Sequence, residues 1–185
     1  MIFSWLSFFM PNLNVEIKAR CRQPGVVRNY LMQHDALYKG LDEQTDTYFN
    51  VVNGRLKLRE GTIENNLIFY NRSNQPGPKS SHFQLVKIND LAGLKEVLTK
   101  ACGIKMIVRK NREIYYIGNV KFHIDEVPGL GSYVEIEAGN VQADKTEAEL
   151  LEQCRFYLKE FGIREEELIA ESYSDMMLGN AKEMQ

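Results

Sequence analysis

The stretch "LNVEIKARCR", residues 13–22, alternates without a break between apolar and polar side chains. Such alternation is typical of a β-strand that buries one face. The polar face carries the charged residues Glu16, Lys18, Arg20 and Arg22. The fold therefore depends on whether this charged face meets solvent or lines an enclosed space.

Length and composition indicate one domain with a real core. The chain has 185 residues, of which 44% are hydrophobic and 26% charged, and its net charge is only −2. A balance of this kind marks neither a nucleic-acid-binding protein nor a disordered acidic chain. The three cysteines, Cys21, Cys102 and Cys154, lie far apart and form neither a metal-ligand spacing nor a disulfide framework. We expect a cytoplasmic protein with reduced thiols.

The first residues, "MIFSWLSFFM", are apolar but too few to span a bilayer, and they lack the basic start and cleavage site of a signal peptide. We expect residues 1–12 to be an apolar extension. It is either a misassigned start, with Met10 as the natural one, or a dispensable segment. A membrane-surface anchor is the alternative. Residues 13–180 are the expected domain, and residues 181–185 a tail.

Turn signals divide the rest of the chain into eight expected strands and three or four helices. Asn53-Gly54 and Gly118-Asn119 mark hairpins, and Asp90 is placed to cap a helix that ends before Gly103. Because the strands follow one another mostly through hairpins, the sheet is expected to be mostly antiparallel and the class α+β.

Charged faces recur on later strands, and their charge changes sign along the chain. The middle strands are nearly all basic on this face, whereas the first strand and the last two carry the carboxylates. The positions after the first strand are Arg55, Lys57 and Arg59; Arg72; Lys87; Lys110 and Arg112; Lys121, His123 and Asp125; and Glu135 and Glu137.

Two arrangements satisfy this pattern. The charged faces can point to solvent around an apolar core, or they can point inward while amphipathic helices cover an apolar outside. The uneven distribution of charge and the apolar stripes of the helices favour the inward arrangement. An enclosed basic lining calls for a polyanion, and carboxylates beside a polyanion call for a divalent cation, Mg²⁺ or Mn²⁺.

The same residues form a pattern that resembles the CYTH superfamily, named for class IV adenylate cyclases and thiamine triphosphatases. The family signature E-x-E-x-K reads Asn14-Val15-Glu16-Ile17-Lys18 here. Further matches follow in order over residues 13–178: "DTYF", "LKLRE", "IFYNR", "VRKNREIY", "HIDEVPGLGSYVEIE" and "SYSDMM". The resemblance implies a closed eight-stranded antiparallel β-barrel, or tunnel, with a charged interior and flanking amphipathic helices.

The resemblance also implies roles for individual residues. The metal ligands would be Glu16, Asp125, Glu135 and Glu137, and the catalytic residues Glu16, Lys18 and Glu135. The phosphate-binding residues would be Lys18, Lys57, Arg59, Arg72, Lys87, Lys110 and Arg112. His123 is interpreted either as a general base near the metal or as a hydrogen-bonding residue of a polar lining.

One position departs from the family pattern. The first glutamate of the signature is Asn14 here, which offers a neutral oxygen instead of a carboxylate. A metal site that loses an anionic ligand usually binds its ion less tightly. The departure therefore predicts one tightly held ion in place of two, or a shifted reaction.

Three functions follow from the resemblance. The first is a divalent-metal-dependent phosphohydrolase acting on a triphosphate small molecule. The second is a class IV-type adenylate cyclase that makes cyclic AMP and pyrophosphate from ATP. The third is a polyphosphate- or nucleotide-binding module without turnover. The resemblance is compatible with a homodimer, and neither nucleic acid nor a membrane is expected as a partner.

Overall fold

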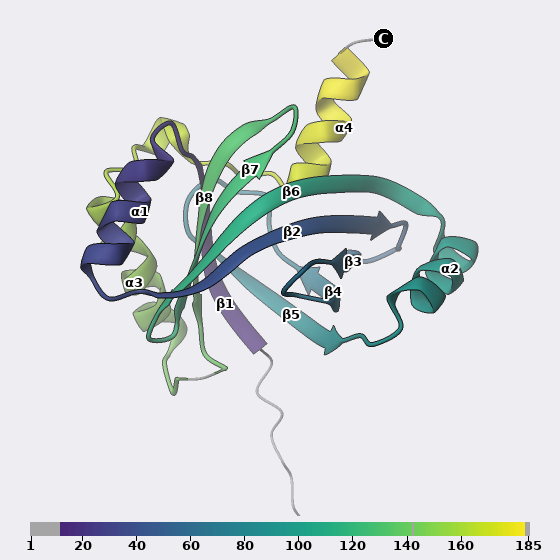
Figure 1. Ribbon diagram of the computed structural model, residues 1–185, viewed down its shortest axis with the longest axis horizontal. Helices are drawn as coiled ribbons and strands as arrows, with labels where there is room; N and C mark the ends of the chain where they lie inside the picture. The colour runs from purple at the N-terminus through teal and green to yellow at the C-terminus, as the bar shows by residue number, and fades with distance from the viewer. Residues whose placement is uncertain (1–11, 142, 184–185) are drawn as a thin grey trace, which may run out of the picture.

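The computed structural model describes residues 12–141 and 143–183, so most of the expected N-terminal extension lies outside the described residues. Eight strands, four α-helices and one 3₁₀ turn follow one another along this part of the chain (Figure 1). The strands are β1 (Asn12–Arg20), β2 (Leu37–Phe49), β3 (Arg55–Glu60), β4 (Asn66–Asn71), β5 (Lys79–Lys87), β6 (Ile104–Ile117), β7 (Val120–Val127) and β8 (Gly131–Gly139). The helices are α1 (Pro24–Gln33), α2 (Leu91–Cys102), α3 (Glu147–Glu160) and α4 (Tyr173–Glu183), and the 3₁₀ turn is Glu165–Glu167.

All eight strands join one ring of antiparallel pairs, in the order β1-β5-β4-β3-β2-β6-β7-β8. The ring closes because β1 pairs with β5 on one side and with β8 on the other. The expected α+β class and antiparallel sheet are confirmed.

Two of the turns predicted from sequence have the backbone that their residues favour. Gly118-Asn119 connects the register pair Ile117 and Val120, and Gly118 has a φ of 55°. Gly54, before β3, has a φ of 65°, and a Cβ on it would lie 2.9 Å from the carbonyl oxygen of Tyr70. Only glycine satisfies both conditions at position 54.

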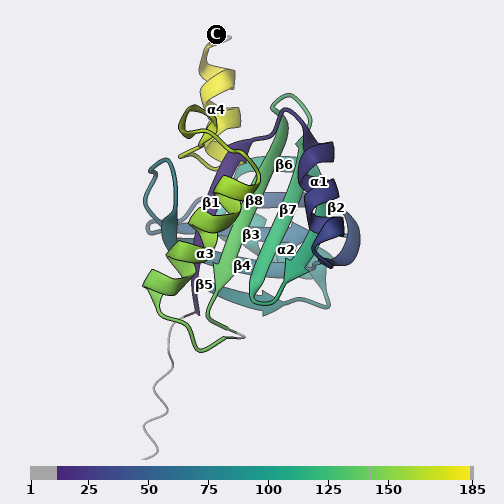
Figure 2. The same cartoon turned by 90° about the vertical axis from the view of Figure 1, so that its left-hand side faces the viewer.

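Apolar side chains lie outside the ring, between its strands and two helices. On β1, Val15, Ile17 and Ala19 point outward and are buried. They belong to a cluster that includes Val27 and Leu31 of α1 and Leu150 and Cys154 of α3. Figure 2 shows α3 lying across β1 and β8, and α1 beside β7. This cluster confirms, for β1, β7 and β8, that helices cover an apolar outer face.

The expectation of covering helices is wrong for the opposite side of the ring. Phe69, Val86 and Ile107, on the outer faces of β4, β5 and β6, are exposed. Helix α2 lies beyond the ends of the strands and buries none of its own residues (Figure 1). The C-terminal tail expected at residues 181–185 begins inside a helix, because α4 continues to Glu183.

Candidate functional site

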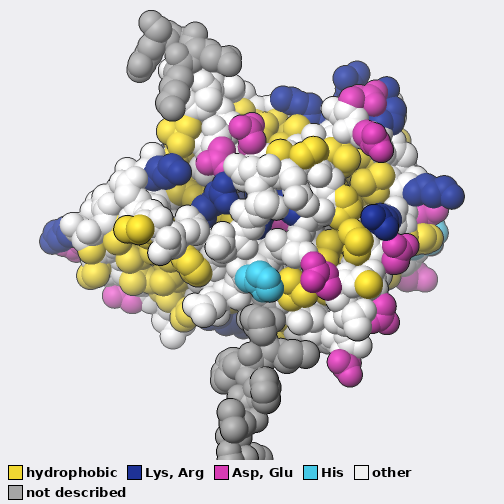
Figure 3. All heavy atoms as spheres, turned by 180° about the vertical axis from the view of Figure 1, so that it is seen from behind, with side chains coloured by type: hydrophobic (Ala, Val, Ile, Leu, Met, Phe, Trp, Pro, Cys, Tyr) yellow, Lys and Arg dark blue, Asp and Glu magenta, His cyan; other side chains and the backbone are white. Residues whose placement is uncertain are grey.

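The interior of the ring holds a charged cavity of about 140 Å³. Its lining includes seven basic and four acidic side chains, together with aromatic residues. In Figure 3, basic side chains are visible in the recessed centre of the face shown. The charged lining residues are Glu16, Lys18, Lys57, Arg59, Glu64, Arg72, Lys110, Arg112, Lys121, Glu135 and Glu137.

Strand register explains why acids and bases from different strands meet. On β1, Lys18 lies opposite Glu135 of β8, which lies opposite His123 of β7. One step along the strands, Glu16 lies opposite Glu137, which lies opposite Lys121. Because inward positions recur every two residues, the alternation seen in the sequence becomes two rows of charge across three strands.

Asp46 of β2 holds three basic side chains together. Its carboxylate accepts hydrogen bonds from Lys57 (3.0 Å), Arg59 (2.9 and 3.1 Å) and Lys110 (2.6 Å). Burial acts to raise the pKa of the Asp46 carboxyl, but Arg59 and Lys110 hold it well below its usual value. Burial lowers the pKa of Lys110 to about 7, with Arg59 and Arg112 adding to the effect and Asp46 opposing it.

Glu135 of β8 is the corresponding anion on the other wall. Lys18 lies 3.0 Å from one of its carboxylate oxygens and Arg112 lies 2.7 Å from the other. Burial acts to raise the pKa of Glu135, but Arg112 and Lys18 hold it well below its usual value. Thus the expected residues Lys18, Arg112 and Glu135 form one contact group inside the cavity.

Asp125 is separated from the other expected metal ligands by its own partners. Arg112 donates to both oxygens of this carboxylate, at 2.6 and 2.5 Å, and the Tyr173 hydroxyl donates to Oδ2 at 2.7 Å. Asp125 is buried behind the guanidinium and does not line the cavity. In this structure Asp125 holds the orientation of Arg112, and the ligand role expected from the resemblance stays a prediction.

Glu16 and Glu137 lie at the same level of the cavity but differ in their partners. Glu16 is paired with Arg72, whose Nε lies 3.1 Å from Oε1. Burial raises the pKa of Glu16, and Arg72 only partly offsets the effect. Glu137 has no Lys or Arg partner within ion-pair distance among the described residues, and the imidazole of His123 faces it with Nδ1 at 3.6 Å.

The residues around His123 fit a divalent cation. One ligand atom each from His123, Glu135 and Glu137 lies within 4.8 Å of the other two. His123 is 1% exposed, and its Nε2 has no hydrogen-bond partner in the described part of the chain. Two carboxylates and an imidazole are a donor set that divalent ions accept. Of the four expected ligands, the structure thus brings Glu135 and Glu137 together, and it adds His123.

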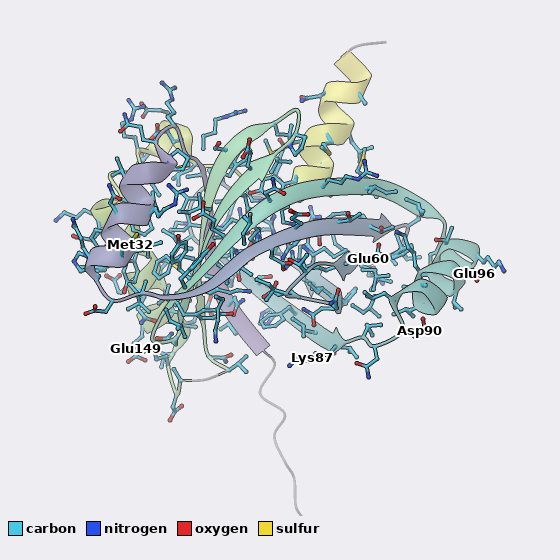
Figure 4. All side chains as sticks on the ribbon, viewed as in Figure 1. Met32, Glu60, Lys87, Asp90, Glu96 and Glu149 are labelled. Carbon is cyan, nitrogen blue, oxygen red and sulfur yellow. The ribbon has the colours of Figure 1, made fainter. Side chains whose placement is uncertain are left out.

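Lys87 does not reach the cavity. It shares the inward side of β5 with Phe83 and Leu85, but it is exposed at the outer end of the strand (Figure 4). It borders only the wider opening of the ring. Lys87 thus lies apart from the other residues expected to bind phosphate, because it stands at the far end of β5, and its phosphate-binding role stays a prediction.

Sequence reasoning gave no role to several residues of the interior. Glu64 comes from the loop after β3 and accepts hydrogen bonds from Arg59 (2.8 Å) and Lys121 (2.5 Å). The buried carboxylate of Asp42 fixes this loop by accepting from the backbone N–H groups of Ile63 and Glu64. Lys121 shares the face of His123 in the sequence, which was a usable signal, whereas a loop residue such as Glu64 has no periodicity to reveal it.

Lys79 and Tyr173 close one end of the interior. Lys79 is buried at the start of β5, and its Nζ donates to the carbonyl oxygens of Ile169 and Ala170. Tyr173 begins α4, and the Lys18 Nζ lies 3.6 Å from its ring centroid. The C-terminal segment therefore contributes to the lining, which no strand pattern predicts.

A family model described as CYTH domain matches residues 12–173. This chain belongs to the CYTH domain family. A relative from Methanocaldococcus jannaschii, named "Putative adenylate cyclase", is 25% identical over 178 residues, which cover 89% of this chain and 98% of the relative. None of the helices in residues 12–141 and 143–183 is long and apolar enough to cross a membrane.

Solved structures share the fold of this CYTH domain. A conserved hypothetical protein from Pyrococcus furiosus matches with a TM-score of 0.74 at 23% identity, over 88% of this chain and 98% of that chain. A protein from Vibrio parahaemolyticus, described as a putative adenylate cyclase, matches with a TM-score of 0.72 at 16% identity, over 89% and 97%. These matches support the ring architecture of the CYTH domain.

Proposed function

We propose that this CYTH domain is a divalent-metal-dependent enzyme that acts on a triphosphate small molecule, most simply as a phosphohydrolase. The observation that carries the proposal is the cavity lining, in which basic residues from four strands converge beside a carboxylate pair with a histidine. A chain of phosphates needs several cations in a row, and a metal site at one end identifies the reacting phosphate.

The chain's own residues would bind and orient the substrate. Lys57, Arg59 and Lys110 share the single carboxylate of Asp46, so phosphate oxygens can complete their charge balance. Arg112 is held rigid by Asp125, which leaves it oriented toward Glu135 and the cavity. A bound divalent cation would supply charge neutralisation on the phosphate oxygens. Positioning and electrostatic stabilisation are the main catalytic contributions in phosphoryl transfer.

Ion pairs offset the buried charges of the cavity. Within the cavity, Lys18 and Arg112 contact Glu135, and Arg72 contacts Glu16. An entering phosphate group would replace these carboxylates as the partner of the basic side chains. The carboxylates would then be available to a cation. Binding of the cation and of the phosphate is therefore expected to be mutually favourable.

Product analysis tests the proposal. We would incubate the protein with Mn²⁺ or Mg²⁺ and with ATP, thiamine triphosphate or inorganic tripolyphosphate, and resolve the products. Orthophosphate release supports the phosphohydrolase. Loss of one charged hydrogen bond in Lys57→Ala should lower kcat/KM by about tenfold or more. Lys100→Ala, on the exposed surface of α2, is the matched control.

Adenylate cyclase is the second candidate, because relatives of similar length and fold carry that name. A cyclase would form cyclic AMP and pyrophosphate from ATP and would not act on the other two substrates. A binding module is the third candidate, favoured by the neutral side chain of Asn14 in the cavity lining. Binding of tripolyphosphate without any turnover would contradict both enzyme proposals and select the module.

A further inference from the structure

His123 lies where a buried imidazole meets two carboxylates. Its Nδ1 is 3.2 Å from Glu135 Oε2 and 3.6 Å from Glu137 Oε1, and its side chain is 1% exposed. Glu135 and Glu137 line the cavity, whereas His123 lies behind them in the wall. The three residues come from adjacent strands, so their relative positions are set by sheet register.

The surroundings of the ring leave its hydrogen bonding incomplete. A neutral imidazole has one N–H group and one lone pair. With the proton on Nδ1, the ring donates to Glu135 Oε2 at 3.2 Å, and the Nε2 lone pair has no donor among the described residues. With the proton on Nε2, that N–H has no acceptor there, and the Nδ1 lone pair faces two carboxylate oxygens. The second tautomer is unfavourable without a cation, but a cation between the three atoms would use the Nδ1 lone pair as a ligand.

The separations suit coordination by one ion. Bonds of about 2.1 Å at right angles place two ligand atoms about 3.0 Å apart. The two Nδ1–oxygen distances are 3.2 and 3.6 Å, and the three ligand atoms lie within 4.8 Å of one another, so the two carboxylates would move inward to bind one ion. Glu135 Oε2 also accepts from Arg112 at 2.7 Å, which a carboxylate oxygen with two lone pairs can sustain.

Other oxygen donors nearby are already engaged or uncharged. Asp125 is paired with Arg112, Glu16 with Arg72, and position 14 offers only an amide. Mg²⁺ takes oxygen ligands, so an imidazole nitrogen in the ligand set disfavours it. Imidazole instead favours first-row transition ions.

We propose that His123 binds the divalent cation through Nδ1, together with Glu135 and Glu137, and that the site therefore selects Mn²⁺ or a similar transition ion over Mg²⁺. This inference deepens the proposed function, because it names the ion of that site. Binding of the ion can be measured without substrate, so the two proposals fail separately.

Pulsed electron paramagnetic resonance of the full chain with Mn²⁺ alone tests the nitrogen ligand. We expect a nitrogen coupling that changes when the protein is labelled with ¹⁵N-histidine, a measurement that requires no substitution. His123→Gln should remove the coupling and weaken Mn²⁺ binding about tenfold or more, whereas Mg²⁺ binding should change little. His34→Gln and His82→Gln, both at exposed residues, are the matched controls.

Three outcomes would overturn the inference: no Mn²⁺ binding, bound Mn²⁺ without a histidine coupling, or a coupling that persists in His123→Gln. If the protein turns over a triphosphate but its Mn²⁺ has only oxygen ligands, the proposed function holds and this inference fails. If the histidine coupling is present but no triphosphate is turned over, this inference holds and the proposed function fails.

Discussion

Single carboxylates organise the charge inside the ring. Asp46 alone contacts Lys57, Arg59 and Lys110, and Glu64 joins Arg59 to Lys121. The expectation that an enclosed basic lining requires a bound polyanion is therefore too strong, because these carboxylates offset most of the basic charge. Seven basic residues line the cavity against four acidic ones, and the buried carboxylates of Asp46 and Asp125 offset two more, which leaves a surplus of one positive charge.

Lys110 gives the anion site a pH dependence. Its pKa is about 7, so its ammonium group is charged below that pH and loses its proton above it. Affinity for tripolyphosphate should fall as the pH rises from 6 to 8. Lys110→Arg keeps its charge throughout and should flatten this part of the profile. Tripolyphosphate affinity is measured by calorimetry for both proteins at each pH. Ionisation of the ligand affects both proteins equally, so it cancels in the comparison.

Equal pH profiles for the two proteins would contradict this assignment. The groups that face Lys110 include Asp46, Arg59, Arg112 and Lys57, and Asp46 keeps its charge in this range because its pKa is well below its usual value. A urea midpoint for Lys110→Arg close to that of the original protein is the control for folding.

At the scale of elements, two helices of similar length differ in what they contribute. Helix α3 buries Leu150 and Cys154 against the ring, and Thr146 and Glu149 form a capping box at its start. Helix α2 is capped by Asp90 but buries no residue (Figure 1). Burial of an apolar face, more than capping, couples a helix to the rest of a domain.

Hydrogen exchange should separate these helices. We expect the amides of α2 to exchange through local opening, well before those of α3. Asp90→Ala should speed exchange in α2 with little change in the global urea midpoint. Thr146→Ala should instead lower the global free energy of unfolding by about 1 kcal/mol. Equal protection in the two helices, or a global loss of stability in Asp90→Ala, would contradict this view.

At the scale of the molecule, a closed ring couples its ligand to folding. The lining residues come from all eight strands, so ligand binding stabilises contacts across the whole sheet. At a ligand concentration 100 times Kd, the expected gain is about 2.7 kcal/mol. For a chain of this size the gain corresponds to a rise in Tm of roughly 5–10 °C.

Thermal unfolding with Mn²⁺ and tripolyphosphate measures this coupling. Sodium chloride at matched ionic strength should give a much smaller shift, because it only screens the charges. Lys57→Ala should reduce the shift caused by tripolyphosphate. A shift of the same size with salt alone would show that the cavity binds no specific anion.

The sequence by itself determined which face of each strand is charged. Alternation at Leu13–Arg22 and at Val120–Val127 sets sidedness through the two-residue period of a strand, a local property. Turn residues such as Gly118 and cap residues such as Asp90 act within a few positions of themselves. The strands, three of the helices and most of the cavity residues were predictable for this reason.

Tertiary structure alone decided which charges meet. Strand register and loop paths decide that Asp125 pairs with Arg112 and that Lys87 lies outside the cavity. They also decide that Glu64 and Tyr173 line it. These contacts join residues far apart in the chain, and no periodic pattern encodes their distance. His123 is the sharpest case: its face was readable from sequence, but only the closed sheet places its nitrogen beside Glu135 and Glu137.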